Sequence, residues 1–157
     1  MSATEWNHCP QCAKRLLEEK QNTDDRPRLA CPDGHYIHYA NPIPTSIGLV
    51  EHEGKYLILK RGYDPKAGEW DLPGGFIEAT ETPAECLIRE LKEETGLEIE
   101  VGPLIGVFPS VYGDDGRKIL GIAMFAKAST DEVTLSEENT EARWVTLEEM
   151  PPLAWVG

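Results

Sequence analysis

Residues 72–97 read LPGGFIEATETPAECLIRELKEETGL, and this stretch decides the fold. After the tight Leu-Pro-Gly-Gly turn, Thr82-Pro83-Ala84-Glu85 combines an N-cap threonine, a proline at the first helical position and a glutamate at N3. Apolar residues then recur at i, i+3, i+4 and i+7, the spacing of one helix face; they are Ala84, Leu87, Ile88 and Leu91. Gly96 is a natural helix stop. The stretch predicts a loop followed by one helix that begins after Thr82 and ends before Gly96.

Three glutamates lie on one side of this expected helix. Glu90, Glu93 and Glu94 occupy positions i, i+3 and i+4, so their carboxylates share adjoining parts of the helix surface. Like charges this close repel one another unless water or a cation screens them. Mg²⁺ and Mn²⁺ take oxygen ligands and bridge to phosphate oxygens, so the cluster suits such ions. A solvated glutamate-rich helix face is the alternative interpretation of these three residues taken alone.

The spacing across the whole stretch matches a family motif. Every fixed position of the Nudix box is present: Gly75, five residues, Glu81, seven residues, Arg89-Glu90-Leu91, one residue, Glu93-Glu94, one residue and Gly96-Leu97. The chain therefore resembles the Nudix hydrolases, from about Ile43 to the C-terminus. This resemblance implies an α/β fold, an α/β/α sandwich with a mixed sheet. The reaction it implies is attack of a metal-activated water on a phosphorus of a nucleoside diphosphate linked to another group.

The resemblance also assigns roles to individual residues. Glu93 and Glu94 match the main ligands of a catalytic Mg²⁺ or Mn²⁺, and Glu90 matches a further ligand or the base that activates water. The Gly74 carbonyl matches a backbone ligand of the same metal. Arg89 matches the arginine that pairs with the carboxylates of the box and fixes their geometry. The substrate contacts expected from the box and the segment after it are Gly74, Gly75, Glu78 and Tyr112.

In many family members a later acid supplies a second metal ligand or the catalytic base. Glu138 and Glu141, just before Ala142-Arg143-Trp144, are the candidates for this role. An ordinary solvated loop is the alternative for both. Trp70 is interpreted as a core residue in preference to a platform for base stacking.

A second motif lies in the first forty residues. Cys9-Pro10-Gln11-Cys12 forms a C-x₂-C pair, and Cys31 and His35 form a C-x₃-H pair after eighteen intervening residues. These spacings are used for tetrahedral Zn²⁺. The sequence predicts a structural zinc ribbon over residues 1–40, which precedes a Nudix domain over residues 41–157.

The fourth zinc ligand departs from the four-cysteine pattern. Gly34 stands where a four-cysteine ribbon would have its last cysteine. His35 is the expected replacement, with His38 or His8 as further choices. Loss of the site is the alternative. Cys86, in the expected helix, is interpreted as a small buried residue.

The combination of ribbon, Tyr39-Ala40-Asn41-Pro42 bridge and Nudix domain resembles the pyrophosphatases that act on ADP-ribose, FAD or NADH. Val107–Tyr112 lacks the signature of the NADH-directed members, and the short tail around Pro151–Trp155 resembles FAD and ADP-ribose hydrolases. ADP-ribose or FAD is therefore the expected substrate. The alternatives are an NADH pyrophosphatase, an RNA cap-removing enzyme and a non-catalytic nucleotide sensor.

Charge and composition restrict the partners. The net charge is −13, and residues 75–100 and 129–150 each contribute −6. This acidity suits a site for hard cations and argues against a nucleic-acid partner, which requires a basic surface. The first residues lack the features of a signal peptide and no apolar run could span a bilayer, so a cytoplasmic location away from membranes is expected. A homodimer is left open.

Alternating apolar residues predict strands on both sides of the helix. They are expected at Ile43–Val50, at Tyr56–Leu59 and at about 99–108, 118–127 and 142–146. A turn is expected at residues 113–116. Thr146-Leu147-Glu148-Glu149 repeats the capping pattern and suggests a second, short helix.

Overall fold

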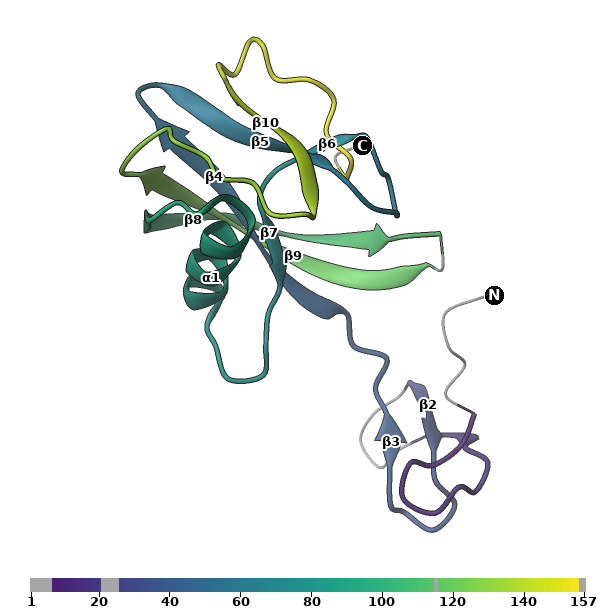
Figure 1. Ribbon diagram of the computed structural model, residues 1–157. Coiled ribbons are helices and arrows are strands. Elements are labelled where there is room, and N and C mark those ends of the chain that lie inside the picture. The colour runs from purple at the N-terminus through teal and green to yellow at the C-terminus, as the bar shows by residue number, and fades with distance from the viewer. Residues whose placement is uncertain (1–6, 21–25, 115, 156–157) are drawn as a thin grey trace. The chain divides into compact units, whose positions relative to one another are not determined.

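The computed structural model describes residues 7–20, 26–114 and 116–155. The chain forms two compact units, Met1–Asn41 and Pro42–Gly157 (Figure 1). The first unit contains a three-stranded antiparallel sheet in the order β1 (Leu17–Lys20), β2 (Pro27–Ala30) and β3 (Ile37–His38). No helix among the described residues is long and apolar enough to cross a membrane.

The second unit is built on a seven-stranded mixed sheet. Its main path runs β10 (Asn139–Val145), β5 (Lys55–Arg61), β4 (Ile43–His52), β9 (Arg117–Ala128) and β8 (Ile99–Tyr112). β4 and β9 are parallel, whereas β5 pairs antiparallel with β4 and β10, and β8 pairs antiparallel with β9. Two short strands lie off this path: β6 (Trp70–Asp71) pairs with β5, and β7 (Gly74–Phe76) pairs with β4. The expected strands are present, and most are longer than the sequence predicts.

Helix α1 (Pro83–Thr95) forms where the capping pattern predicts it. The Thr82 hydroxyl accepts a hydrogen bond from the Glu85 N–H at 3.3 Å, and the Glu85 carboxylate accepts one from the Thr82 N–H at 2.8 Å. At the other end, Gly96 adopts the left-handed conformation, with φ of 72°. Local sequence therefore sets both ends of the helix.

The core of the second unit lies between α1 and one face of the sheet. Leu87 and Leu91 are fully buried against a cluster that includes Val50 of β4 and Leu57 of β5. Cys86 is also fully buried, as the sequence predicts. Ile88 is 42% exposed, so the apolar stripe is narrower than expected. The sheet covers the helix face that carries Leu87 and Leu91, and Ile88 lies at the edge of that face.

The expected second helix is absent. The Thr146 N–H and hydroxyl both donate to the Glu149 carboxylate, at 3.2 and 3.1 Å, so one half of the capping box forms. Residues 147–149 nevertheless make only a bend and turn, and α1 is the one helix within residues 7–20, 26–114 and 116–155. Pro151 and Pro152 follow directly and lack the N–H groups that a continuing helix needs.

Candidate functional site

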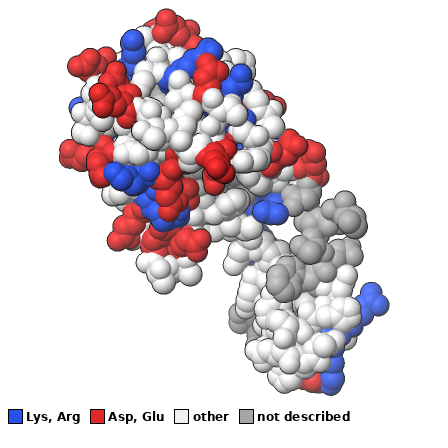
Figure 2. Space-filling view, viewed as in Figure 1, with Lys and Arg blue, Asp and Glu red and all other residues white. Residues whose placement is uncertain are grey.

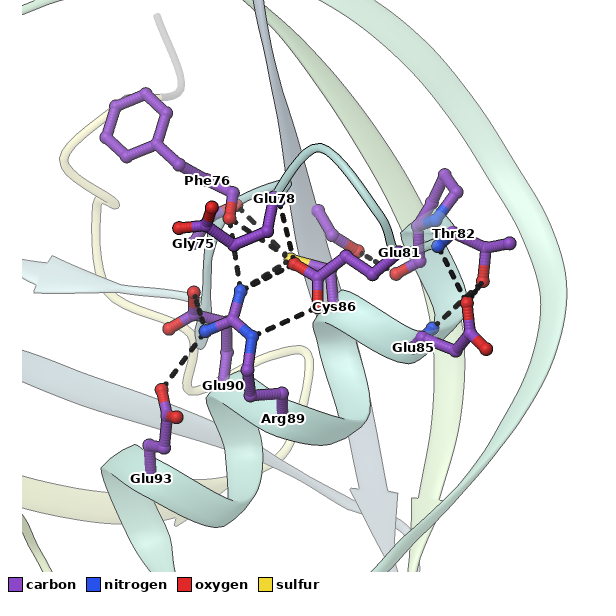
Figure 3. A network of polar contacts seen from close by, with 12 residues as sticks. Gly75, Phe76, Glu78, Glu81, Thr82, Glu85, Cys86, Arg89, Glu90 and Glu93 are labelled. Carbon is purple, nitrogen blue, oxygen red and sulfur yellow. Dashed lines mark hydrogen bonds and ion pairs between the residues drawn. The ribbon is translucent and has the colours of Figure 1, made fainter.

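Arg89 is the hub of a polar network at the helix (Figure 3). Its Nε and Nη2 atoms donate to the two carboxylate oxygens of Glu81, at 3.0 and 2.7 Å. Its Nη1 atom donates to Glu90 at 2.8 Å and to Glu93 at 3.1 Å, and Nη2 also donates to the Phe76 carbonyl at 3.2 Å. The two bonds from Arg89 lower the pKa of Glu81 to about 2. The arginine thus ties the helix to the preceding loop.

Glu94 lies on the same helix but has different partners. Its carboxylate accepts from the Gly74 backbone N–H at 3.1 Å and from the Asn139 side-chain amide at 3.3 Å. Burial raises the pKa of Glu94 to about 8 despite these two hydrogen bonds, and the negative charges of Glu90 and Glu138 add to the increase. Burial also raises the pKa of Glu90, with Arg89 acting in the opposite direction.

Two glycines allow the loop backbone to reach these carboxylates. Gly74 has φ of +148°, and a Cβ there would lie 2.1 Å from the Ser46 carbonyl oxygen of β4. A Cβ on Gly75 would lie 2.2 Å from Oε1 of Glu90. Any other residue at either position would push the loop off the sheet or displace the Glu90 carboxylate. Glu90 and Glu94 therefore flank the Gly74–Gly75 backbone.

The donor set fits a hard divalent cation. Glu90, Glu94 and Glu138 supply oxygen atoms, and a bound cation would offset the burial and the neighbouring negative charges that raise the pKa values of Glu90 and Glu94. In this structure Arg89 holds Glu93, whose side chain is 60% exposed. Arg89 contacts Glu93 through Oε2, so the carboxylate has a second oxygen that could bind a cation.

The structure separates the two later acids. The charge of Glu138 acts on both Glu90 and Glu94, and the Glu138 carbonyl accepts from the Gly62 N–H at 2.8 Å. Glu141 instead pairs with Arg143 at 2.6 Å and Lys60 at 3.6 Å. Ala142 and Trp144 pack toward the core beneath α1, and strand residues alternate, so Glu141 points to the opposite face of the sheet. Only Glu138 of the two lies beside the acidic cluster.

Asn139 is a site residue that the sequence reasoning missed. Strand alternation would place it on the same face as Glu141, two residues along β10. The pairing register of β10 with β5 shifts between Asn139 and Glu141, however, and this irregularity turns the Asn139 amide toward Glu94. No motif in the sequence predicts such a shift in strand register.

The other residues singled out from the sequence have different neighbours. Glu78 is exposed, and its backbone N–H donates to Glu81 at 2.9 Å. Tyr112 is at the end of β8, where its ring meets that of Phe76 edge-on, with 5.4 Å between the ring centroids. Trp70 is half-buried on β6 beneath Arg143, whose guanidinium is 4.6 Å from the ring centroid. Trp70 is outside the core cluster, contrary to the prediction.

The predicted zinc ligands come together in the first unit. The ligand atoms of Cys9, Cys12, Cys31 and His35 all lie within 4.8 Å of one another. Hydrogen bonds within both turns hold this arrangement, from the Ala13 N–H to the Cys9 carbonyl and from the Gly34 N–H to the Cys31 carbonyl, each 2.9 Å. Three thiols and one imidazole at this separation suit Zn²⁺.

The alternative histidines have other contacts. His38 lies 3.4 Å from the Tyr36 hydroxyl through Nδ1, and His8 is in a β-bridge with Arg15. Around the thiols the apolar core is small: among the described residues its buried members are Cys9, Leu16 and Cys31. A bound metal would compensate for this small core.

Comparison with known proteins agrees with both units. The NUDIX domain family matches residues 42–156, and the Nudix N-terminal zinc-ribbon family matches residues 7–40. An ADP-ribose pyrophosphatase from Methanocaldococcus jannaschii is 35% identical over 120 residues, 76% of this chain and 71% of the relative. The crystal structure of a NUDIX hydrolase from Nitrosomonas europaea superposes with a TM-score of 0.77 at 31% identity, covering 92% of this chain and 80% of that one.

A further relative extends across both units. The NAD-capped RNA hydrolase NudC from Vibrio parahaemolyticus is 29% identical over 153 residues, which is 95% of this chain. The match covers 54% of that relative, so this chain spans about half of its length. Together with the box geometry, these matches establish that the chain belongs to the Nudix hydrolase family.

The raised pKa of Glu94 leads to a testable effect on stability. A group whose pKa is higher in the folded protein stabilises it below the ordinary pKa of 4.5 and loses that contribution as the pH approaches 8. Without added divalent cation, the parent should therefore lose stability relative to Glu94→Gln between these pH values. Urea unfolding of both proteins at several pH values measures the difference, and a constant difference would contradict the assignment.

Proposed function

We propose that this chain hydrolyses the pyrophosphate bond of a nucleoside diphosphate linked to another group, with ADP-ribose or FAD as substrate. The proposal places the reaction in residues 41–157 and gives residues 1–40 a structural zinc. The observation that carries it is the pair of half-buried carboxylates, Glu90 and Glu94, beside the Gly74–Gly75 backbone. Figure 2 shows acidic side chains over much of the visible face of the larger unit, a surface that suits small cations better than polyanions.

The chemistry of the family needs a divalent cation. Mg²⁺ or Mn²⁺, when bound, neutralises phosphate charge and lowers the pKa of a water molecule. Glu90, Glu93 and Glu94 would hold it, together with the Gly74 carbonyl. Arg89 keeps Glu90 in place and fixes the loop through Glu81 and the Phe76 carbonyl.

Glu138 is the proposed base. It is exposed directly before β10, its charge acts on the half-buried Glu90 and Glu94, and its backbone carbonyl accepts from the Gly62 N–H. From there its carboxylate can take a proton from the attacking water. Asn139, which donates to Glu94, is a positioning residue because it orients a ligand and touches no reacting atom.

The substrate preference can be tested directly. We expect ADP-ribose or FAD to be cleaved faster than NADH, because the segment Val107–Tyr112 lacks the NADH signature and a relative named ADP-ribose pyrophosphatase is 35% identical. Initial rates for the three compounds at one Mg²⁺ concentration measure the preference. A clear preference for NADH would overturn this part of the proposal.

An RNA substrate is the second candidate. The match to NAD-capped RNA hydrolase NudC favours it, because that match runs through both units of this chain. The acidic surface opposes it. Release of the cap from a short NAD-capped RNA, compared with hydrolysis of free NAD⁺ at equal concentration, distinguishes an RNA-directed enzyme from one that acts on the dinucleotide.

A further inference from the structure

A groove of about 1030 Å³ lies at the end of the β8–β9 hairpin. Three segments distant in sequence line it: residues 64–66 after β5, residues 110–114 with Arg117 in the hairpin, and residues 153–155 near the C-terminus. A hydrogen bond from the Ala154 N–H to the Trp70 carbonyl, 2.8 Å long, holds the third segment against β6. None of the box glutamates lines this groove.

Two aromatic rings form one wall of the groove. Tyr112 and Trp155 stack with their centroids 4.9 Å apart and their planes 23° from parallel. Phe76 meets Tyr112 edge-on from the other side. An aromatic wall of this kind favours planar aromatic groups without regard to their hydrogen-bonding pattern.

Three cationic side chains surround this stack in a strongly acidic protein. The Lys66 ammonium lies 5.1 Å from the Trp155 centroid, and the Arg61 guanidinium lies 5.6 Å from the same centroid. Arg117 approaches the Tyr112 ring at 5.9 Å. Asp64 and Asp114 also line the groove, so its charge is balanced and it is not a simple anion site. The stack provides most of the recognition, and the cations suit a polar or phosphate-bearing edge.

Phe76 connects the groove to the glutamate cluster. It follows Gly75 directly, and its carbonyl accepts from Arg89 while its ring points away from the Arg89 network (Figure 3). That ring contacts Tyr112. A ligand with its phosphates at the Gly74–Gly75 loop would therefore have aromatic side chains next to that loop.

We propose that this groove binds the aromatic base of the substrate's nucleoside on the Tyr112–Trp155 stack, with Lys66 and Arg117 beside the ribose and its phosphate. The inference rests on the proposed function and extends it. In this proposal the affinity at this end of the site comes from recognition of the base. The group on the far side of the pyrophosphate does not contribute to it.

Binding of AMP and of ribose 5-phosphate to the full chain, without added divalent cation, tests the groove. Both compounds carry one phosphate, and only AMP carries a base. We expect AMP to bind at least about tenfold more tightly, because stacking of a base on an aromatic side chain has an effect of this order. Calorimetric titration measures both affinities. Equal affinities would overturn the proposal.

Variants from two different segments identify the surface. Trp155→Ala and Tyr112→Leu should each weaken AMP binding about tenfold and leave ribose 5-phosphate unchanged, whereas Trp155→Phe should retain most of the AMP affinity. Tyr56→Leu, at the opposite end of β5 from Arg61, is the matched control and should bind AMP as the parent does. AMP binding unaffected in both groove variants, with melting temperatures confirming that they fold, would refute the assignment.

Hydrolysis is measured separately. With ADP-ribose, the groove variants should raise KM about tenfold and change kcat by less than about threefold, since the base lies away from the reacting phosphorus. AMP contains no pyrophosphate bond, so its binding is independent of turnover. If the parent binds AMP in the groove but hydrolyses no substrate, the proposed function is disproved and the assignment of the groove as a base-binding site still holds.

Discussion

Glu94→Gln should lower kcat/KM for ADP-ribose by roughly a hundredfold or more in Mg²⁺, because losing metal-based charge stabilisation costs several kcal/mol in the transition state. The substitution keeps the size of the side chain, and its single carbonyl oxygen can still accept from either the Gly74 N–H or the Asn139 amide, which bond to different carboxylate oxygens of Glu94 in the parent. It removes the negative charge that a divalent cation would neutralise. Folding should therefore survive the change while activity does not.

The same experiment on Glu93 tests the second ligand. Glu93→Gln should also reduce activity about a hundredfold. Its effect on stability should be small, because its side chain is 60% exposed and its ion pair with Arg89 is at the surface. Excess Mn²⁺ should restore part of the activity in both variants if the substitutions weaken metal binding. Initial rates as a function of metal concentration measure this directly.

Glu98→Gln is the control for both variants. Glu98 lies just beyond the box, is 72% exposed and pairs only with Lys92 among the described residues. This variant should keep nearly the parent's rate. Parent-like rates in Glu93→Gln and Glu94→Gln, with every substrate tested, would show that the metal site has been assigned to the wrong residues.

Removal of zinc from the first unit should have the other large effect. We expect about one Zn²⁺ per chain by elemental analysis, bound with an apparent free energy on the order of 10 kcal/mol, as in small zinc modules. Cys31→Ser should abolish it, because the Cys31 thiol is buried within 4.8 Å of the other three ligand atoms. Without the metal the first unit has only the small cluster around Leu16 to stabilise it.

Hydrogen exchange shows where stability is lost. Backbone protection should disappear across residues 7–41 in Cys31→Ser and persist in α1 and the large sheet. Cys86→Ser is the matched control, because Cys86 is buried in α1 of the other unit and its loss should leave the zinc content unchanged. Protein purified without chelator and found to contain no zinc would contradict the assignment. A large loss of hydrolysis in Cys31→Ser would contradict a purely structural role.

The features that could be predicted from the sequence alone depend on interactions between residues close together in the chain. The capping box at Thr82, the stop at Gly96 and the arrangement of Glu90, Glu93 and Glu94 depend on residues within a few turns of one another. Helix periodicity therefore places them without knowledge of the rest of the chain. The ribbon ligands follow from the same reasoning, since each C-P turn defines its own geometry and one ion joins the two halves.

Only the tertiary structure decided what surrounds these motifs. The register shift in β10 brings Asn139 to Glu94. Strand alternation places Glu141 on the opposite face of the sheet, so strand pairing determines that Glu138, and not Glu141, lies near the acidic cluster. The second helix failed because Pro151 and Pro152 outweigh the capping contacts of Thr146. The Tyr112–Trp155 stack joins a hairpin to a segment some forty residues later in sequence. Such contacts depend on packing between segments that are distant in sequence, so motif spacing along the chain does not predict them.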